Sequence, residues 1–411
     1  MRINWKKYHG LDIMLIFLFG MIIRIVYVST LEPQIFWYDG QEYLRLAQGI
    51  MSDRAYLAPD GSATAFWPPG YPAFLSVLGS QIMNIRLAQA LLGAITVLLV
   101  YTLGREFLSR RQALLAAFFA AVYPLYIYTA GSLFPVVYLA FLITLIFALL
   151  VRSLEEGTGL RAFLAGIFGA LATLTSAAVL PALLLSIPWL WIEGERKRRG
   201  RGLRLALLFA LPLILIVGAW TARNVGHFQR PVLVSLNGGY NFWLGNYPGV
   251  NAKTGNRWTP EMEAEYHALS QEHTGEAELD LALRNRAIEF IRENPVRFIG
   301  LSFSKGLNLW RLYPLPMTED RPGLNAEKLI SIFSYGLALP FALFFLFTTL
   351  KRWAGSRLAL IFFLTYTAVH AVILSKFRFR LPLDGILIVL AAGGVGKALK
   401  MIGWRFLEDP E

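Results

Sequence analysis

Apolar segments long enough to cross a lipid bilayer recur along this chain of 411 residues. A hydrocarbon core is about 30 Å thick, so a helix needs roughly 20 mostly apolar residues to span it. Because lipid offers the backbone no hydrogen-bond partner, and because these segments are rich in Leu and Ala, we predict helices and not barrel strands. The predicted crossings are residues 11–30, 85–105, 111–129, 132–151, 160–177, 179–192, 203–221, 326–350, 356–374 and 381–398. The sequence therefore predicts an all-α polytopic membrane protein of about ten transmembrane helices.

The basic residues of the short loops predict the orientation of the chain, because Lys and Arg near helix ends are retained on the cytoplasmic side. They fall on one face: at Lys6 and Lys7, at Arg105, Arg110 and Arg111, at Arg152 and Arg161, in residues 193–204 with six basic side chains, in residues 351–357, and at Lys397 and Lys400. We therefore predict one membrane domain over residues 1–411 in the cytoplasmic membrane, with both termini inside. Two larger segments, residues 31–80 and 223–325, fall outside. The net charge of +12 then reflects topology, and nucleic acid is not an expected partner.

The first outer segment carries a carboxylate, Asp39, just past the first crossing and beside Trp37 and Tyr38. A partly desolvated carboxylate at such a boundary can take a proton from a hydroxyl nucleophile. Asp is also a favoured N-cap, so the alternative is that Asp39 only caps a helix that begins at Gly40 or Gln41. Asp39 is thus the candidate general base.

The rest of the two outer segments predicts short surface elements. Apolar residues at helical spacing after Asp39 predict an amphipathic helix along the membrane surface, and the three prolines of residues 67–72 predict a stiff turn. Residues 237–249 combine turn formers with aromatic side chains, a composition that suits sugar rings, and residues 276–293 predict a surface helix. The candidate substrate-binding residues here are Glu42, Tyr43, Tyr71, Asn237, Tyr240 and Asn246.

Residues 295–312 are apolar enough to suggest a further crossing, yet they carry Arg297, Lys305 and Arg311. If this segment crossed the membrane, the basic residues of 351–357 would move outside, against the charge pattern. We therefore predict an interfacial or re-entrant helix with Lys305 near the outer surface.

Cationic residues at the outer ends of the predicted crossings form a second group of candidates. Lys376, Arg378 and Arg380 lie at the outer start of the tenth crossing, where a basic cluster departs from the topological rule unless it has an anionic partner. A phosphate at the bilayer surface is the natural partner, since guanidinium groups bind phosphate oxygens in pairs. An error of one crossing is the alternative. The candidate phosphate-binding residues are Arg86, Arg223, Lys305, Arg378 and Arg380.

The histidines predict no metal site. His267 and His273 are six residues apart and the other histidines are isolated, without the spacing of metal ligands. No P-loop or Rossmann glycine pattern occurs in a suitable context. We therefore predict no cofactor, and a bound divalent metal has no support in the sequence.

Several short motifs, taken in order with the topology, resemble one family of membrane enzymes. They are Asp39 with Tyr43 and Ala47, residues 69–72, Arg86 with Gln89, residues 220–224, residues 237–246, residues 290–295 with Lys305, and residues 378–382. With these motifs the chain resembles the GT-C glycosyltransferases of family 39, the group of protein mannosyltransferases and aminoarabinose transferases. The likeness spans nearly the whole chain. It departs from the family at residues 132–136, where an acidic residue often stands, and this puts a second acidic ligand in doubt.

The resemblance implies an inverting glycosyltransferase that moves a sugar from a polyprenyl-phosphate donor to a hydroxyl acceptor on the outer face of the membrane, with Asp39 as the catalytic base. The acceptor is a glycan, a lipid or a protein, and the other partners are membrane lipids. One rival is a transporter or flippase for a lipid-linked sugar, although the internal repeats typical of transporters are not visible. Another rival is a non-catalytic subunit of an envelope assembly.

Overall fold

A computed structural model describes residues 10–35, 37–53, 55–250, 258–313, 326–404 and 406–409. Lys6 and Lys7, and the parts 251–257 and 314–325 of the predicted second outer segment, lie outside the described residues. Within the described ranges the chain forms helices and no strand, with a single isolated bridge between Leu57 and Ala63. The predicted all-α class is confirmed.

Each of the ten predicted crossings coincides with apolar helix. Eight helices of the described chain are long and apolar enough to span a membrane: α1 (Leu11–Ser29), α4 (Ile82–Gly104), α7 (Val136–Glu156), η2 with α9 (Ala177–Lys197), α10 (Arg201–Phe228), α15 to α16 (Lys328–Thr349 within Ala326–Thr349), α17 (Ala354–Val372) and η4 with α18 (Phe377–Met401). The remaining two are α8 (Gly159–Thr175), which has 17 residues, and the bent pair α5 (Arg110–Val122) and α6 (Pro124–Ala130). The protein is a multi-pass membrane protein.

The bend between α5 and α6 has a local cause. The two helices meet at 46°. Pro124 has no N–H to continue the α5 ladder, and its ring disfavours the helical conformation for the preceding residue. Tyr123 accordingly has extended dihedrals, φ −64° and ψ 113°. The chain after α6 leads into the start of α7, where Val136 and Leu139 line a cavity.

Small residues allow the bundle helices to approach closely. A Cβ atom on Gly166 of α8 would lie 2.2 Å from the Phe209 carbonyl oxygen of α10, and one on Gly202 of α10 would lie 2.0 Å from the Trp191 oxygen of α9. Such backbone contacts replace the hydrophobic driving force that helices lack in lipid.

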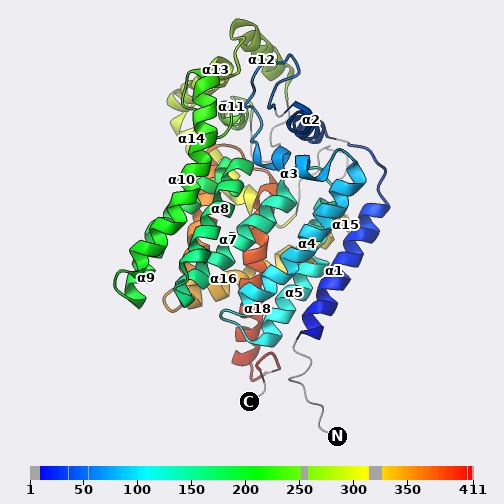
Figure 1. Ribbon diagram of the computed structural model, residues 1–411, viewed down its shortest axis with the longest axis vertical. Helices are drawn as coiled ribbons and strands as arrows, with labels where there is room; N and C mark the ends of the chain where they lie inside the picture. Colours follow the sequence, from blue (N-terminus) through cyan, green and yellow to red (C-terminus); the bar gives the residue numbers. More distant parts are fainter. Residues whose placement is uncertain are drawn as a thin grey trace.

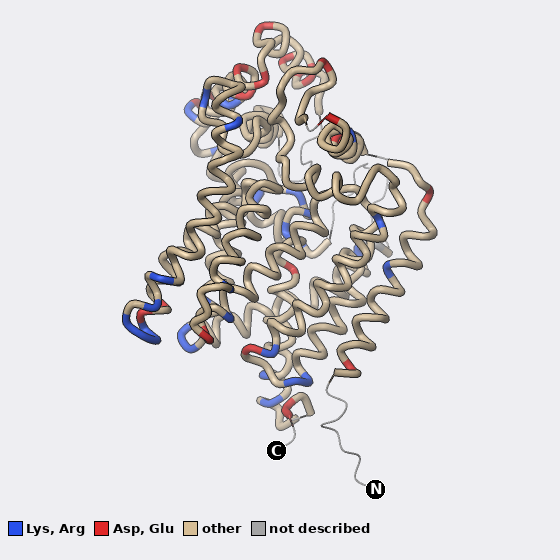
Figure 2. Tube along the Cα trace, in the orientation of Figure 1, with Lys and Arg blue, Asp and Glu red and all other residues tan. Residues whose placement is uncertain are grey.

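The remaining helices form a cap over one end of the bundle (Figure 1). They are α2 (Tyr38–Asp53), α3 (Gly70–Leu78), α11 (Gly238–Gly245), α12 (Pro260–Glu272), α13 (Glu276–Glu293) and α14 (Pro295–Leu309). The start of α1 and the end of the described C-terminal residues lie at the opposite end (Figure 1). Figure 2 shows Lys and Arg gathered in the loops at that end, whereas the cap carries both signs of charge. The alternation of charge predicted from the sequence is therefore a property of the folded molecule.

The helix predicted at residues 295–312 is α14. Its 15 residues span about 22 Å, too short to cross a bilayer. Val296, Ile299, Phe303 and Leu307 form one face and are 61 to 83% exposed, while Lys305 is buried on the other face. This arrangement fits a short helix whose apolar face lies against lipid.

Candidate active site

A cavity of about 1130 Å³ lies between the cap and the bundle. Its walls come from α2, the loop that follows it, the start of α7, η2 (Ala177–Val179), the segment before α11, and the connection from α17 to η4 (Phe377–Leu383). The two predicted outer segments therefore meet the C-terminal third of the chain at one hollow.

Asp39 lines this cavity from the first turn of α2. The alternative prediction, a helix that begins at Gly40 or Gln41 with Asp39 as its cap, is wrong. Helix α2 begins at Tyr38, and the Trp37 carbonyl accepts hydrogen bonds from the N–H groups of Gly40 and Gln41. Asp39 thus lies within the first turn, where the free N–H groups favour negative charge, and its side chain is 39% exposed.

Arg378 lies opposite Asp39, with 3.9 Å between its Nη2 and the Asp39 Oδ2. Its guanidinium lies 4.4 Å from the centre of the Phe134 ring, a cation–π contact that holds it at the cavity wall. Phe134 belongs to residues 132–136, the segment where the chain departs from the acidic residue often found in the family it resembles. An aromatic support for the arginine stands there instead.

Lys376 also lines the cavity, two residues before Arg378. Burial lowers the pKa of Lys376 to about 8, the Arg378 guanidinium acts in the same direction, and Asp39 opposes both. The sequence places Lys376 in the basic cluster, but Lys376 is not among the predicted phosphate-binding residues. Its signal was its place in the connection after α17, directly before η4, which carries Arg378.

The structure does not bring Arg86 or Arg223 to the cavity. The Arg86 guanidinium donates hydrogen bonds to the carbonyl oxygens of residues 31, 32, 34 and 131, which fix the chain after α1 against the end of α6. Arg223 donates to the carbonyl oxygens of Tyr56 and Thr64 and lies over the Trp220 ring. Both arginines bind protein backbone, so their geometry is that of structural clamps.

Lys305 and Asn246 form another internal anchor. The Lys305 Nζ donates to the carbonyl oxygens of Gly245, Val372 and Ile373 and to the Asn246 Oδ1. Two of these carbonyls end α17, where the helix leaves them without partners. Burial lowers the pKa of Lys305 to about 8. Neither residue is among those that line the cavity.

Arg380 lies inside the bundle, away from the cavity. Its side chain is fully buried and its Nε is 3.5 Å from the Oδ1 of the fully buried Asp384. The guanidinium lies 3.3 Å from the centre of the Tyr335 ring and 4.2 Å from that of Phe377. The Tyr123 hydroxyl donates to the other Asp384 oxygen at 2.8 Å. Arg378 and Arg380, neighbours in the sequence, thus have different surroundings.

Four of the six predicted substrate-binding residues line the cavity: Glu42, Tyr43, Asn237 and Tyr240. Asn246 does not, as described above. Tyr71 also lies outside the lining, because its hydroxyl donates to the Gln89 Oε1 at 2.7 Å, and its ring packs edge-on against Tyr43. Tyr71 therefore supports a lining residue from behind.

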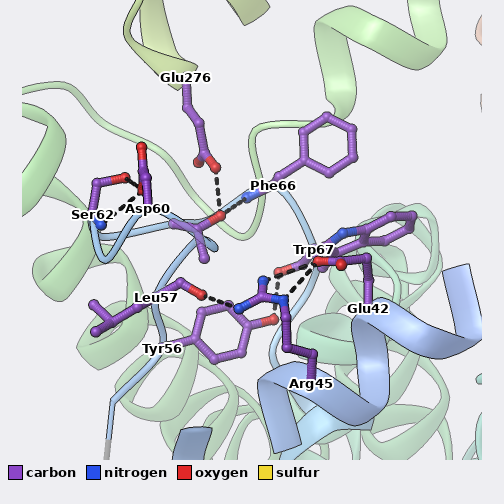
Figure 3. A network of polar contacts seen from close by, with 10 residues as sticks. Glu42, Arg45, Tyr56, Leu57, Asp60, Ser62, Phe66, Trp67 and Glu276 are labelled. Atoms are coloured by element: carbon purple, nitrogen blue, oxygen red, sulfur yellow. Dashed lines mark hydrogen bonds and ion pairs between the residues drawn. The ribbon is translucent and has the colours of Figure 1, made fainter. Parts of the chain in front are cut away.

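A polar network holds the loop between α2 and α3 at the cavity rim (Figure 3). The Arg45 guanidinium donates two hydrogen bonds to Glu42 and one to the Leu57 carbonyl. Across the loop, Glu276 at the start of α13 accepts hydrogen bonds from the Thr64 hydroxyl and the Ala65 N–H, at 2.5 and 2.9 Å. The network joins the two outer segments, and sequence reasoning had missed it.

The described residues contain no group of three His, Cys, Asp or Glu side chains placed to hold a metal ion.

Residues 71–220 match the family model of dolichyl-phosphate-mannose-protein mannosyltransferases. No curated protein matches the sequence. Archaeal oligosaccharyltransferase AglB from Archaeoglobus fulgidus, in complex with an inhibitory peptide and a dolichol-phosphate, superposes with a TM-score of 0.58 at 15% identity over 97% of this chain and 51% of that chain. The chain has the GT-C fold.

This GT-C chain spans about half the length of the archaeal enzyme. The same enzyme tethered to an acceptor peptide gives a TM-score of 0.56 at 16% identity, over 97% of this chain and 50% of that chain. ArnT from Cupriavidus metallidurans in the apo state gives 0.40 at 15% identity, over 94% and 78%. The fold assignment rests on the archaeal enzyme, and the predicted GT-C resemblance is confirmed.

Proposed function

We propose that this chain is an inverting glycosyltransferase that moves a sugar from a polyprenyl-phosphate donor to a hydroxyl acceptor. The observation that carries the proposal is the pairing of Asp39 with Arg378, 3.9 Å apart on the wall of one large cavity between cap and bundle. A base and a phosphate-binding cation are the two groups that such a transfer needs at adjacent positions.

In this proposal Arg378 and Lys376 bind the donor phosphate and Asp39 is the general base. The acceptor oxygen attacks the anomeric carbon from the side opposite the phosphate, so the configuration inverts. The bond from the anomeric carbon to the phosphate oxygen breaks, and the phosphate keeps the electron pair. Asp39 takes the acceptor proton. The two cations stabilise the charge that develops on the leaving phosphate, a contribution that grows in a site with little water.

The bundle side of the cavity is suited to the lipid part of such a donor. Leu139 of α7, Ala177 of η2, Pro181 of α9 and Val369 of α17 form an apolar wall among the membrane helices. AglB, the fold relative described above, was captured with a dolichol-phosphate, a carrier of the same chemical class. This wall therefore supports a polyprenyl chain that reaches the cavity from lipid.

The charge distribution supports an orientation in which the cap and cavity face outside and both termini face the cytoplasm (Figure 2). We place the protein in the cytoplasmic membrane on the same ground, with residues 1–411 as one membrane domain and residues 31–80 and 223–325 as its outer segments. The sugar leaves the carrier on the outer face in this scheme.

An enzyme is favoured over a lipid-linked sugar flippase and over a non-catalytic subunit. Residues 71–220, which include the helices from α4 to α9 complete, match a family model of mannosyltransferases. A flippase would need a cation site but no base beside it. Asp39 in the cavity, with its carboxylate facing the cation, is the feature that only the transferase uses.

The test is transfer by purified protein in lipid nanodiscs, with radiolabelled polyprenyl-phosphate sugars as donors and host envelope fractions as acceptors. Asp39→Asn should reduce the transfer rate by about 10²- to 10⁴-fold, the usual contribution of a general base. Asp53→Asn, at the other end of α2, is the matched control and should keep full activity. Transfer by Asp39→Asn within tenfold of the unchanged protein would remove the base assignment. Carrier movement across vesicles without transfer would identify a flippase.

A further inference from the structure

One wall of the cavity is an unbroken row of aromatic rings. Neighbouring ring centroids lie 5.0 to 6.2 Å apart along the row, and every member lines the cavity. In order, the rings are Tyr43 of α2, Trp67 and Phe66 of the following loop, Tyr240 of α11, and then Tyr266 of α12 with Trp258 just before that helix. We call this set the aromatic strip. Four separate segments of the chain contribute to it, so only the folded cap forms it.

The aromatic strip begins next to the proposed base. Tyr43 follows Asp39 by four residues on α2, which places both on the same helix face. From there the row leads into the cap, away from the apolar wall of α7 and α17. Figure 3 shows the Phe66 and Trp67 rings projecting from the same side of their loop. At its far end Trp258 is 41% exposed. The strip thus connects Asp39 to the outside of the molecule.

The groups beside the aromatic strip are polar, and the acidic side chains among them have hydrogen-bond or ion-pair partners. Glu42 binds Arg45 at 2.9 Å and Asp280 binds Arg284 at 2.8 Å, while Glu276 is bound by the Thr64 hydroxyl and a backbone N–H. Among the described residues of this wall, the two arginines Arg45 and Arg284 are outnumbered by the carboxylates Glu42, Glu276 and Asp280, so the wall has no excess of positive charge to attract the phosphate of a lipid acceptor. Neutral polar groups line this wall as well, among them the Tyr240 hydroxyl and the Asn241 amide, whose Nδ2 donates to the Asn237 carbonyl.

A wall of rings with neutral hydrogen-bonding groups at its edges matches the two surfaces of a sugar. The C–H face of a pyranose can lie on an aromatic ring, and its hydroxyls can bind the amides beside it. Burial raises the pKa of Tyr240 to about 12, so this hydroxyl stays protonated and can donate a hydrogen bond. Pockets that combine apolar walls with a few placed polar groups are the usual form of small-molecule sites.

We propose that the aromatic strip binds the acceptor and that the acceptor is a saccharide, which rests on the proposed function. A glycan chain lies along the strip with its terminal ring beside Tyr43, so that one hydroxyl of that ring reaches Asp39. The hydroxyl proton passes to Asp39, the new glycosidic bond forms to the donor sugar, and polyprenyl phosphate leaves with the electron pair. A longer glycan extends past Trp258.

Binding and kinetics together test the proposal. The full-length protein in nanodiscs is applied to an array of immobilised oligosaccharides, and undecaprenyl phosphate binding is measured separately by calorimetry. We expect binding to at least one glycan class, and Tyr266→Ala and Trp258→Ala should weaken it about tenfold or more, with Tyr266→Phe and Trp258→Phe restoring it. Trp404→Ala, an exposed tryptophan at the opposite end of the molecule, is the matched control. In the transfer assay the alanine variants should raise the acceptor KM and leave the donor KM unchanged.

The results distinguish a failure of the saccharide-acceptor proposal from a failure of the proposed glycosyltransferase function. The proposal of a saccharide acceptor is overturned if the protein binds none of the arrayed glycans. It is also overturned if the aromatic substitutions leave the acceptor KM unchanged. Sugar transfer to a peptide or a lipid acceptor, at a rate that is unchanged in these variants, overturns the proposal as well. Glycan binding by a protein that neither binds undecaprenyl phosphate nor transfers sugar would retain the strip as a glycan site and overturn the transferase.

Discussion

The buried pair of Arg380 and Asp384 allows a quantitative test of which arginine of the basic cluster serves the site. Both side chains are fully buried, and 3.5 Å separates the Arg380 Nε from the Asp384 Oδ1. Replacing one partner of a buried pair leaves an uncompensated charge and costs about 3–5 kcal/mol. Asp384→Asn removes the carboxylate from the guanidinium, which cannot lose its proton and keeps as neutral partners the Arg311 carbonyl and the Tyr335 and Phe377 rings.

Those rings offset part of the loss, because a desolvated cation–π contact contributes about 2 kcal/mol. We therefore expect Asp384→Asn to destabilise the protein by roughly 3 kcal/mol, near the lower end of that range. Arg380→Met should cost less, since the carboxyl left behind can take up a proton and become neutral. The double variant should cost little more than Arg380→Met alone, because removing both charges leaves none unpaired.

The assay is reversible unfolding of the four proteins of this double-mutant cycle in mixed micelles, with undecaprenyl phosphate binding measured on each folded protein. A coupling energy below about 0.5 kcal/mol would refute the structural pairing. Arg380 would be a phosphate ligand after all if the double variant were stable but bound the carrier at least tenfold more weakly. If Arg378 and Lys376 are the ligands, carrier affinity in the stable double variant stays near that of the unchanged protein.

Three further predictions address the lysine, the bundle and the cap. The charge of the carrier phosphate is constant above about pH 7.5. Carrier binding by the unchanged protein should therefore weaken as the pH rises through about 8, where Lys376 loses its proton, and Lys376→Gln should remove this pH dependence. A pH dependence that persists in the variant belongs to Lys305 instead. Gly166→Ala should lower the unfolding temperature because its Cβ would meet the α10 backbone at 2.2 Å, whereas Gly218→Ala, which has open space, should not. Glu276→Gln replaces the charged acceptor of the Thr64 hydroxyl and the Ala65 N–H with a neutral amide, which binds them less strongly, so hydrogen exchange over residues 58–66 should become faster. Unchanged exchange is the contrary result.

The membrane helices could be predicted from the sequence because the bilayer imposes a length that few other structures share. The ten apolar segments and the helices agree to within a few residues, and α8 shows the limit of the rule, since packing against α10 stabilises a helix of only 17 residues. The start of α2 could not be predicted. Whether Trp37 or Asp39 receives the first helical hydrogen bonds depends on the path of the chain after α1, which local sequence does not determine.

The lining of the cavity could be predicted in part, for a physical reason. Asp39 and Arg378 could be predicted because each departs from the charge pattern of the sequence. Asp39 is a carboxylate just past the first predicted crossing, and Arg378 belongs to a basic cluster on the face opposite the short basic loops. Arg86, Arg223 and Lys305 depart in the same way, yet their partners are backbone carbonyl oxygens, which every residue carries and no sequence pattern marks. Only the coordinates separate a cation that binds the protein itself from one that is open to a ligand.

The contact of Asp39 with Arg378 implies competition between the base and the donor. At 3.9 Å the attraction of two unit charges is about 1 kcal/mol at the dielectric constant of water and about 4 kcal/mol at an effective value of 20. Both side chains are more than a third exposed, 36% and 39%, so the value lies near the lower end. A donor phosphate that reaches Arg378 takes this partner from Asp39 and is itself repelled by the carboxylate.

Asp39→Asn removes both effects at once. The variant should therefore bind undecaprenyl phosphate about fivefold more tightly than the unchanged protein, which corresponds to roughly 1 kcal/mol, while transfer is lost. Calorimetric titration at low and high salt measures the gain, which should shrink at high salt because the charges are partly exposed. Weaker carrier binding in the variant would show that Asp39 does not face the phosphate. The same carboxylate would then orient Arg378 and not activate the acceptor, since a positioning role predicts a loss of affinity where a base predicts a gain.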